Sequence, residues 1–416
     1  MTKPSPTLES CAAAQSRAVA RLFFALALAL TLALPLRAQQ PLSLAEADQR
    51  AAALFQQSGF TGMVMVIVRN GEVSIKGYGE TYPGSGVRPD ANSLLRLCSV
   101  SKVFTTDLLL KQVGEGKLSL DDPLQRFAPR GKVVPLGPAG QRITLLELAT
   151  HTSGLPREVS SYPKHTPHFT FPDKDFRWTW LPVQHLKTAP GTAAFYSNIG
   201  FDLLGDALAS ANHRTYAQLL DEQLLRPLAL YNTTLVPSQQ QCSRLLRGNR
   251  DEGPCTDTQP SGPSGGLYST PADMARFLGY LLREPGFPAP PADDLAVHIR
   301  PAQLKTMDGL SHAGDPTGIG LAWIQIGDPA TPSAIIEKTG GGAGFSTYLA
   351  LSPARQTGVF VAVSDGEKGW RVDLFHEAND LLAALANVPP LPPKAPRPHL
   401  ARKHKSARKR RKSAKS

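Results

Sequence analysis

Two side chains in the stretch LCSVSKVFTT have the types and spacing that acyl transfer needs. Ser99 and Lys102 lie three residues apart, which places both on one face of a helix. A serine hydroxyl is a weak nucleophile until a base takes its proton, and a lysine whose pKa is lowered by burial can be that base. The start of a helix also directs backbone N–H groups toward an oxyanion. Taken alone, the pair is better explained by an ordinary capped helix, because Ser and Lys are common residues.

Two further motifs supply the remaining groups. Tyr196 and Asn198, in YSN, are expected in a turn before a helix, where a phenol can move a proton and an amide can bind a substrate amide. Lys338 and Thr339, in KTG, end an apolar run and precede GGAGF. On a strand these two side chains point to opposite faces. We therefore expect Lys338 to shift the pKa values of the tyrosine and the serine. Thr339 is expected to bind a substrate carboxylate.

Other segments imitate catalytic motifs. GPSGG at 262–266 fits G-x-S-x-G, but Pro260 and Pro263 argue against the strand that a nucleophile elbow requires, so we expect a tight turn around Ser264. His151 follows an apolar helical segment and is interpreted as the end of a capped helix. Ser101 is expected to pack or to form a hydrogen bond at the helix start. The ten histidines show no metal-binding spacing, so we predict no metal and no cofactor.

The pattern of apolar residues indicates which elements hold these motifs. An apolar run at 62–69, the pair NG and an alternating run at 72–79 predict a β-hairpin as the first element. Helical spacing covers 103–114, and helices and loops continue to about 285. β character returns after 318, and a final helix is expected over 371–386. We therefore predict an α/β (α+β) fold in which one antiparallel sheet uses both chain ends and a helical lobe spans about 120–285.

The two ends of the chain differ from the body, which we place at 39–388. Residues 1–38 combine basic residues with a short apolar run, which predicts a secretory signal peptide, with an uncleaved anchor as the alternative. Residues 389–416 are Pro-rich and then polybasic, which predicts a disordered tail. Eleven Lys and Arg residues lie from Lys394 to Lys415, so the net charge of +11 belongs mainly to the tail. The body is close to neutral.

The cysteines also indicate an exported protein. Cys242 and Cys255 flank a polar, turn-rich segment, and in an exported protein we expect them to form a disulfide. Closing so short a loop contributes roughly 3 kcal/mol in the chain-entropy model. Zinc is the weaker alternative, because no second pair of ligands lies near. Cys98 is expected to be a buried free thiol.

Taken together, S-x-x-K, Y-x-N and K-T-G in this order resemble the serine β-lactamase and penicillin-binding protein superfamily, on the side of the class C enzymes. Among its members the chain is most similar to periplasmic D-alanyl-D-alanine carboxypeptidase/endopeptidases. The resemblance covers roughly 45–385 and implies a β-lactamase/transpeptidase-like fold. The most similar blocks are YGETYPGSGVRPD, LATHTSGLPRE, AAFYSNIGFDLLGDALA, SGGLYSTPADMARF and EKTGGGAGFSTYLALSP.

The resemblance also implies roles for individual residues. Ser99 would be the acylated nucleophile, Lys102 its proton acceptor and Tyr196 the general base or proton shuttle. The substrate would be bound by Asn198 through its amide and by Lys338 and Thr339 through its carboxylate, and the backbone N–H groups of Ser99 and Gly341 would form the oxyanion hole.

The implied activity is that of a serine hydrolase that cleaves peptidoglycan stem peptides through an acyl-enzyme and binds β-lactams covalently. A class C-like β-lactamase and an esterase of the same fold use the same residues and remain alternatives. A non-catalytic penicillin- or wall-binding module is the alternative of another class. We expect a periplasmic protein, associated with membrane or wall through its basic tail, with no nucleic-acid partner. A solvated tail without a partner is the simpler alternative.

Overall fold

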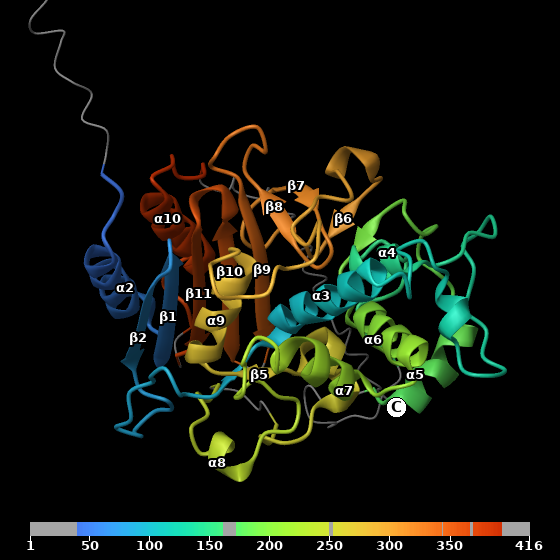
Figure 1. The fold of residues 1–416 in the computed structure, drawn as a ribbon, viewed down its shortest axis with the longest axis horizontal. Coiled ribbons are helices and arrows are strands. Elements are labelled where there is room, and N and C mark those ends of the chain that lie inside the picture. The colour runs from blue at the N-terminus through green and yellow to red at the C-terminus, as the bar shows by residue number, and fades with distance from the viewer. Residues whose placement is uncertain (1–39, 161–171, 249–252, 343, 367–368, 393–416) are drawn as a thin grey trace, which may run out of the picture. The chain divides into compact units, whose positions relative to one another are not determined.

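The computed structural model describes residues 40–160, 172–248, 253–342, 344–366 and 369–392 (Figure 1). The chain divides into two units, 1–42 and 43–416, and the account below concerns the second. The predicted signal peptide and the polybasic part of the predicted tail lie outside the described residues. No helix among the described residues is long and apolar enough to cross a membrane.

A seven-stranded sheet forms the centre of this unit, in the order β2-β1-β11-β10-β9-β8-β7, and each neighbouring pair is antiparallel. The first two strands come from the N-terminal part of the chain, and the others come from its C-terminal part. The prediction of one antiparallel sheet from both chain ends is therefore confirmed. The strands are β1 (Gly62–Arg69), β2 (Glu72–Gly79), β7 (Pro316–Ile319), β8 (Ile324–Ile326), β9 (Ile335–Gly342), β10 (Phe345–Ser352) and β11 (Thr357–Ser364).

The predicted hairpin is β1 and β2, joined by Asn70 and Gly71. Both turn residues have positive φ, 50° and 80°, as a tight primed turn requires. β1 is apolar without alternation because both faces of the sheet are covered. Its Val64, Val66 and Val68 belong to the main core cluster, and the intervening side chains point to the opposite face.

Helices cover the sheet. α2 (Leu44–Ser58) and α10 (Leu374–Ala386) pack against each other and against strands of the sheet, while α9 (Pro271–Leu281) packs against β1 and β11 and lies in front of the sheet in Figure 1. The prediction that the hairpin is the first element was wrong, because α2 precedes it. Ser43 and Glu46 form a capping box at the start of α2, and Gly59 caps its end with φ 80°.

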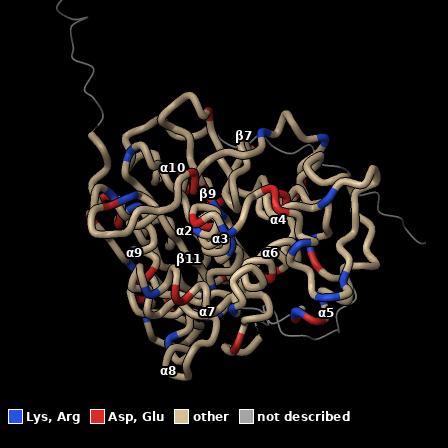
Figure 2. Tube along the Cα trace, turned by 45° about the vertical axis from the view of Figure 1, so that its right-hand side comes forward, with Lys and Arg blue, Asp and Glu red and all other residues tan. Residues whose placement is uncertain are grey.

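The helical lobe lies beside β9 (Figure 1). α3 (Ser101–Gly114) ends at Gly114 as predicted, and it packs against α6 (Asn198–Asn212) and against a short π-helix at Gly262–Gly266. α9 falls within the range expected for the lobe but lies on the sheet. The other helices of this part of the chain are α3 (Ser101–Gly114), α4 (Leu145–Ala149), α5 (Lys174–Trp180), α6 (Asn198–Asn212), α7 (Tyr216–Leu220) and α8 (Gln239–Cys242). Basic and acidic residues are interspersed over the described residues (Figure 2).

Two short strand pairs lead into the candidate motifs. β3 (Leu95–Arg96) pairs with β5 (Tyr268–Ser269) and runs directly into the turn that carries Ser99. β4 (Ala194–Phe195) pairs in parallel with β6 (Met307–Asp308) and ends just before Tyr196. Each pair therefore fixes the backbone immediately before one of these side chains.

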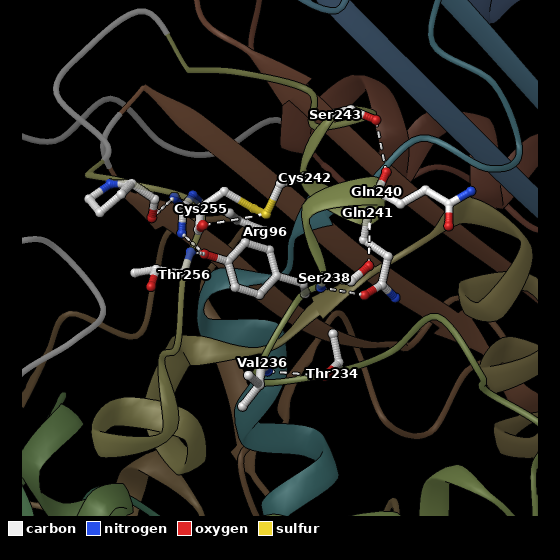
Figure 3. The surroundings of a disulfide bond; sticks show 12 residues. Arg96, Thr234, Val236, Ser238, Gln240, Gln241, Cys242, Ser243, Cys255 and Thr256 are labelled. Atoms are coloured by element: carbon white, nitrogen blue, oxygen red, sulfur yellow. Dashed lines mark hydrogen bonds between the residues drawn. A yellow bond between two sulfur atoms is a disulfide. The ribbon is translucent and has the colours of Figure 1, made fainter.

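Cys242 and Cys255 form the expected disulfide, with an S–S distance of 2.07 Å (Figure 3). The guanidinium of Arg96 lies beside it and donates hydrogen bonds to the carbonyl oxygens of Gly253 and Pro254 and to the Tyr268 hydroxyl. The disulfide loop is therefore tied to the strand that precedes Ser99. Cys98 is buried and does not take part in the disulfide, as expected.

Candidate active site

Ser99 lies on a short 3-10 turn, Cys98–Val100, between β3 and α3. The residue before it, Cys98, has φ 51°, a left-handed conformation that is uncommon for a non-glycine residue. α3 begins only at Ser101, so Ser99 lies outside the α-helix that carries Lys102. From the sequence, both side chains were expected on one helix. The 3-10 turn continues directly into α3, and the two side chains still face each other, with Lys102 Nζ 3.2 Å from Ser99 Oγ.

The strand that carries K-T-G packs directly against this turn. Thr347, opposite Gly340 on the neighbouring strand β10, donates a hydrogen bond from Oγ1 to the Leu97 carbonyl. A Cβ added at Gly340 would lie 2.7 Å from the same carbonyl oxygen and 2.2 Å from Thr347 Oγ1. The absence of a side chain at the K-T-G glycine therefore allows β9 to approach the Ser99 turn.

Lys102 is fully buried and makes three hydrogen bonds. Nζ contacts Ser99 Oγ at 3.2 Å, Asn198 Oδ1 at 2.6 Å and the Ser264 carbonyl at 2.5 Å. The last two partners can only accept. When the amine is neutral they can use its two N–H groups, which leaves its lone pair for the Ser99 proton. Burial lowers the pKa of Lys102, and the nearby Lys338 lowers it further. The geometry therefore suits a proton acceptor for Ser99.

Tyr196 is buried among three cations. Lys102 Nζ, Lys338 Nζ and Arg157 Cζ lie 4.9, 5.2 and 4.8 Å from its ring centroid. Burial by itself would raise the pKa of Tyr196, but Lys102 and Lys338 and hydrogen bonds with Ser99 and Lys102 more than offset this effect and lower the pKa to about 8. A phenol with this pKa can both take and give a proton near neutral pH.

Lys338, Thr339 and Gly341 lie along β9. Lys338 is 2% exposed, extends toward the Tyr196 ring and donates a hydrogen bond to the Thr339 carbonyl. Thr339 and Gly341 instead line the cavity beside Ser99. This arrangement agrees with the expectation that Lys338 and Thr339 point to different sides of the strand.

Asn198 is the first residue of α6, and both ends of its amide are engaged. Oδ1 accepts from Lys102, while Nδ2 donates to Glu158 Oε1. The sequence-based prediction that Asn198 contacts a substrate amide therefore requires Nδ2 to exchange Glu158 for substrate. Glu158 was missed in the sequence, although it lies inside the block LATHTSGLPRE.

The side chains open onto a cavity of about 260 Å³. Lys102, Asn198 and Lys338 lie behind its wall. Arg157, His312, Trp370 and Phe375 line it without having been singled out in the sequence, because the elements that carry them are far apart along the chain. The residues that line it are Ser99, Arg157, Tyr196, His312, Thr339, Gly340, Gly341, Ser346, Trp370 and Phe375.

The segment that resembles G-x-S-x-G and the second serine of the first motif also lie beside the site. Ser264 lies in a short π-helix, Gly262–Gly266, where the sequence predicted a tight turn, and its hydroxyl donates to the Ser261 carbonyl. Its own carbonyl holds Lys102, a role that leaves no signal in the sequence because any residue type supplies a carbonyl. Ser101 Oγ accepts from the Leu267 N–H, as its predicted hydrogen-bonding role requires. Among the described residues, no cluster of His, Cys, Asp or Glu side chains could hold a metal ion.

The comparisons with known proteins agree with this arrangement. The family model described as Beta-lactamase matches residues 47–393. The chain is 40% identical over 346 residues to the D-alanyl-D-alanine-carboxypeptidase/endopeptidase AmpH of Escherichia coli K12, covering 83% of this chain and 90% of the relative. It is 26% identical to a beta-lactamase of Lysobacter lactamgenus, covering 82% of this chain and 92% of that protein.

One solved structure is similar to this chain at nearly the same sequence identity as the AmpH relative. The beta-lactamase/D-alanine carboxypeptidase of Yersinia pestis, complexed with citrate, superposes with a TM-score of 0.77 at 39% identity. The superposition covers 82% of this chain and 97% of that one. The chain therefore belongs to the beta-lactamase family of serine hydrolases.

Proposed function

We propose that the protein is a serine D-alanyl-D-alanine carboxypeptidase/endopeptidase that acts on peptidoglycan stem peptides. The observation that carries this proposal is the contact of Lys102 Nζ with Ser99 Oγ, in a site where Asn198 Oδ1 and the Ser264 carbonyl hold the same nitrogen. The choice of substrate is supported by the 40% identical relative whose name states this activity.

In acylation, Ser99 Oγ attacks the carbonyl carbon of the scissile amide while the Lys102 amine takes the hydroxyl proton. The backbone N–H groups of Ser99 and Gly341 stabilise the charge that develops on the carbonyl oxygen. The proton then passes to the leaving nitrogen through Tyr196, so the C–N bond breaks and the amine leaves neutral. The acyl group remains on Ser99 as an ester.

In deacylation, a water molecule replaces the departed amine. The Tyr196 phenolate takes a proton from this water, and the resulting hydroxide attacks the ester carbonyl. The C–O bond to Ser99 then breaks, and the same proton passes from Tyr196 to Ser99 Oγ, which restores the hydroxyl and the phenolate. A pKa of about 8 makes the phenolate accessible near neutral pH. The products are the shortened peptide and the free enzyme.

The charge at the cavity suits a substrate that ends in a carboxylate. Thr339 lines the cavity, Lys338 lies behind it, and the exposed side of the pocket carries Arg157. Cationic and hydroxyl donors of this kind bind carboxylates. The C-terminal D-Ala of a stem peptide carries such a group, and so do β-lactams, which would acylate the same serine.

The location of the protein is part of this proposal. A periplasmic site follows from the signal peptide predicted over 1–38, and association with anionic envelope surfaces follows from the basic tail. Attraction of each basic residue to an anionic surface contributes about 1 kcal/mol. Deleting 390–416 should reduce co-sedimentation with membranes or cell wall at low salt, and unchanged partition would remove this part of the proposal.

One experiment tests the activity. The purified protein and the variant Ser99→Ala are incubated with muropeptides, a chromogenic cephalosporin and a short-chain ester. Release of D-Ala that disappears in the variant is the expected result. Rapid cephalosporin turnover without D-Ala release would instead assign a β-lactamase, and ester cleavage alone would assign an esterase. β-Lactam binding without any turnover would indicate a non-catalytic module.

A further inference from the structure

His151 lies directly against Tyr196. It follows α4 and has φ 61°, and its side chain is almost completely buried. The imidazole stacks on the Tyr196 ring with centroids 4.3 Å apart and an interplanar angle of 26°. The ring does not line the cavity, so it does not reach a substrate there.

The same residue holds the backbone on both sides of Tyr196. Its carbonyl oxygen accepts the Phe195 N–H at 2.9 Å, and its Nδ1 accepts the Ser197 N–H at 3.0 Å. The N–H of Tyr196 itself is bound by the Asp308 carbonyl at 3.1 Å. Three consecutive N–H groups are therefore fixed, two of them by His151.

The imidazole must be neutral for its Nδ1 to accept the Ser197 N–H. A ring nitrogen that accepts from a backbone N–H carries no proton, so the proton of His151 is on Nε2. This buried Nε2 has no hydrogen-bond partner among the described residues. Burial and the positive charges of Lys102, Lys338 and Arg157 hold the pKa of His151 well below its usual value. An imidazolium would lose the Ser197 bond and would add a fourth cation beside Tyr196.

We infer that His151 is a positioning residue for the proton-transfer step, because it fixes the Tyr196 ring against Lys102 and Lys338 through one stacking contact and two backbone hydrogen bonds. The inference rests on the proposed role of Tyr196. An unpartnered buried Nε2–H is costly, so a phenylalanine would pack more favourably if only an aromatic ring were needed. The acceptor at Nδ1 is the feature that a phenylalanine cannot supply.

Two substitutions separate the two contacts. His151→Asn can place Oδ1 close to the position of Nδ1, and asparagine tolerates a positive φ, so the Ser197 bond is kept while the stacked ring is lost. His151→Phe keeps an aromatic face but removes the acceptor. Leu382→Ala, at a fully buried position in α10, is the control for a loss of stability that does not involve the site.

The first readout needs no substrate and so does not depend on the proposed activity. The tyrosinate absorbance of each protein is titrated against pH, and Tyr196→Phe identifies the transition that belongs to Tyr196. In His151→Phe we expect this transition to move to higher pH, because the phenol is no longer held against the two lysines. His151→Asn should move it less, and Leu382→Ala should not move it. An unchanged transition in both His151 variants would overturn the inference.

The second readout is the rate of acylation by a fluorescent penicillin and of D-Ala release. His151→Phe should lower the rate constant by about 10- to 100-fold, the cost of misplacing a catalytic group, with little change in substrate KM. His151→Asn should restore part of the rate. A loss that only follows the thermal stability, as in Leu382→Ala, would assign His151 a structural role. If the wild type releases no D-Ala, the proposed function fails while the titration still decides the role of His151.

Discussion

Lys102 Nζ lies 3.2 Å from Ser99 Oγ, and Asn198 Oδ1 and the backbone carbonyl oxygen of Ser264 accept its other two bonds. One acceptor lies at the start of α6 and the other lies in the segment 262–266. Two separate parts of the helical lobe therefore contact the lysine. The direction of the amine is therefore set by one side chain of the site and by one backbone carbonyl from outside the predicted motifs.

Lys102→Arg should retain a positive charge and lose activity. A guanidinium remains protonated at any usable pH and cannot accept the Ser99 proton. We expect the rate of acylation by a fluorescent penicillin to fall roughly 10²- to 10⁴-fold, the usual contribution of a general base. Ser99→Ala is the control that abolishes covalent labelling. A rate within a few-fold of wild type would mean that another group activates Ser99.

Lys338→Gln should shift the pH dependence of turnover. Lys338 is one of the two lysines that lower the pKa of Tyr196 to about 8, so its removal should raise that pKa. Activity that requires the phenolate increases as pH rises through this pKa, and the increase should therefore occur at higher pH in the variant. The profile of kcat/KM against pH measures the shift, with Lys305→Gln as a matched substitution outside the cavity lining. An unchanged profile would contradict the role given to Lys338.

Gly340→Ala should destabilise the protein, and Gly341→Ala should not. At Gly340 the new methyl group meets the Leu97 carbonyl oxygen at 2.7 Å, whereas at Gly341 the nearest atom, the Phe345 carbonyl oxygen, is 3.5 Å away. Overpacking of this kind costs about 1–3 kcal/mol. Denaturant unfolding of the two variants measures the difference. Equal stability would show that β9 can move away from the Ser99 turn without cost.

Removing the disulfide should lower stability by about 3 kcal/mol, as expected for a loop of this length in the chain-entropy model. Cys242 and Cys255 are separated by 13 positions. The double variant Cys242→Ser/Cys255→Ser should unfold at lower denaturant concentration, and a reducing agent should bring the wild type to the same midpoint. The double variant serves as its own control because reductant should leave it unchanged. A wild type insensitive to reductant would contradict the prediction.

Arg157→Gln should raise KM for peptides that end in a carboxylate. The guanidinium faces the cavity and packs on the Tyr196 ring, so the substitution removes a cation from the binding surface. A charged hydrogen bond contributes about 1.5–3 kcal/mol, which corresponds to roughly a 10- to 100-fold change in KM. A neutral ester substrate is the comparison and should be affected much less. Equal effects on both substrates would place the role of Arg157 in the fold.

The parts that could be predicted are those in which the side chain itself carries the signal. Ser99, Lys102, Tyr196 and Lys338 were identified by type and order, and the structure brings them together. The hairpin was predictable because Asn70 and Gly71 define its turn. The order of the motifs identified the reacting groups, but it did not indicate which residues hold those groups in position.

The missed parts depend on contacts that have no pattern along the chain. The Ser264 carbonyl could have come from any residue type, and Trp370 reaches the cavity from beyond β11. His151 was interpreted as a helix end because its contact with Tyr196 joins residues far apart in sequence. α2 is the exception, because the capping box of Ser43 and Glu46 is a local signal that was overlooked.

The pairing of β1 with β11 also determines when the enzyme can form. Gly62 lies opposite Ser364, so the first hairpin gains its inner neighbour only after nearly the whole chain has been made. Lys338 and Thr339 likewise reach Ser99 late. Long-range pairing of this kind slows folding because a large loop must close first. A growing chain therefore stays open and free of acylating activity until its last strands are available.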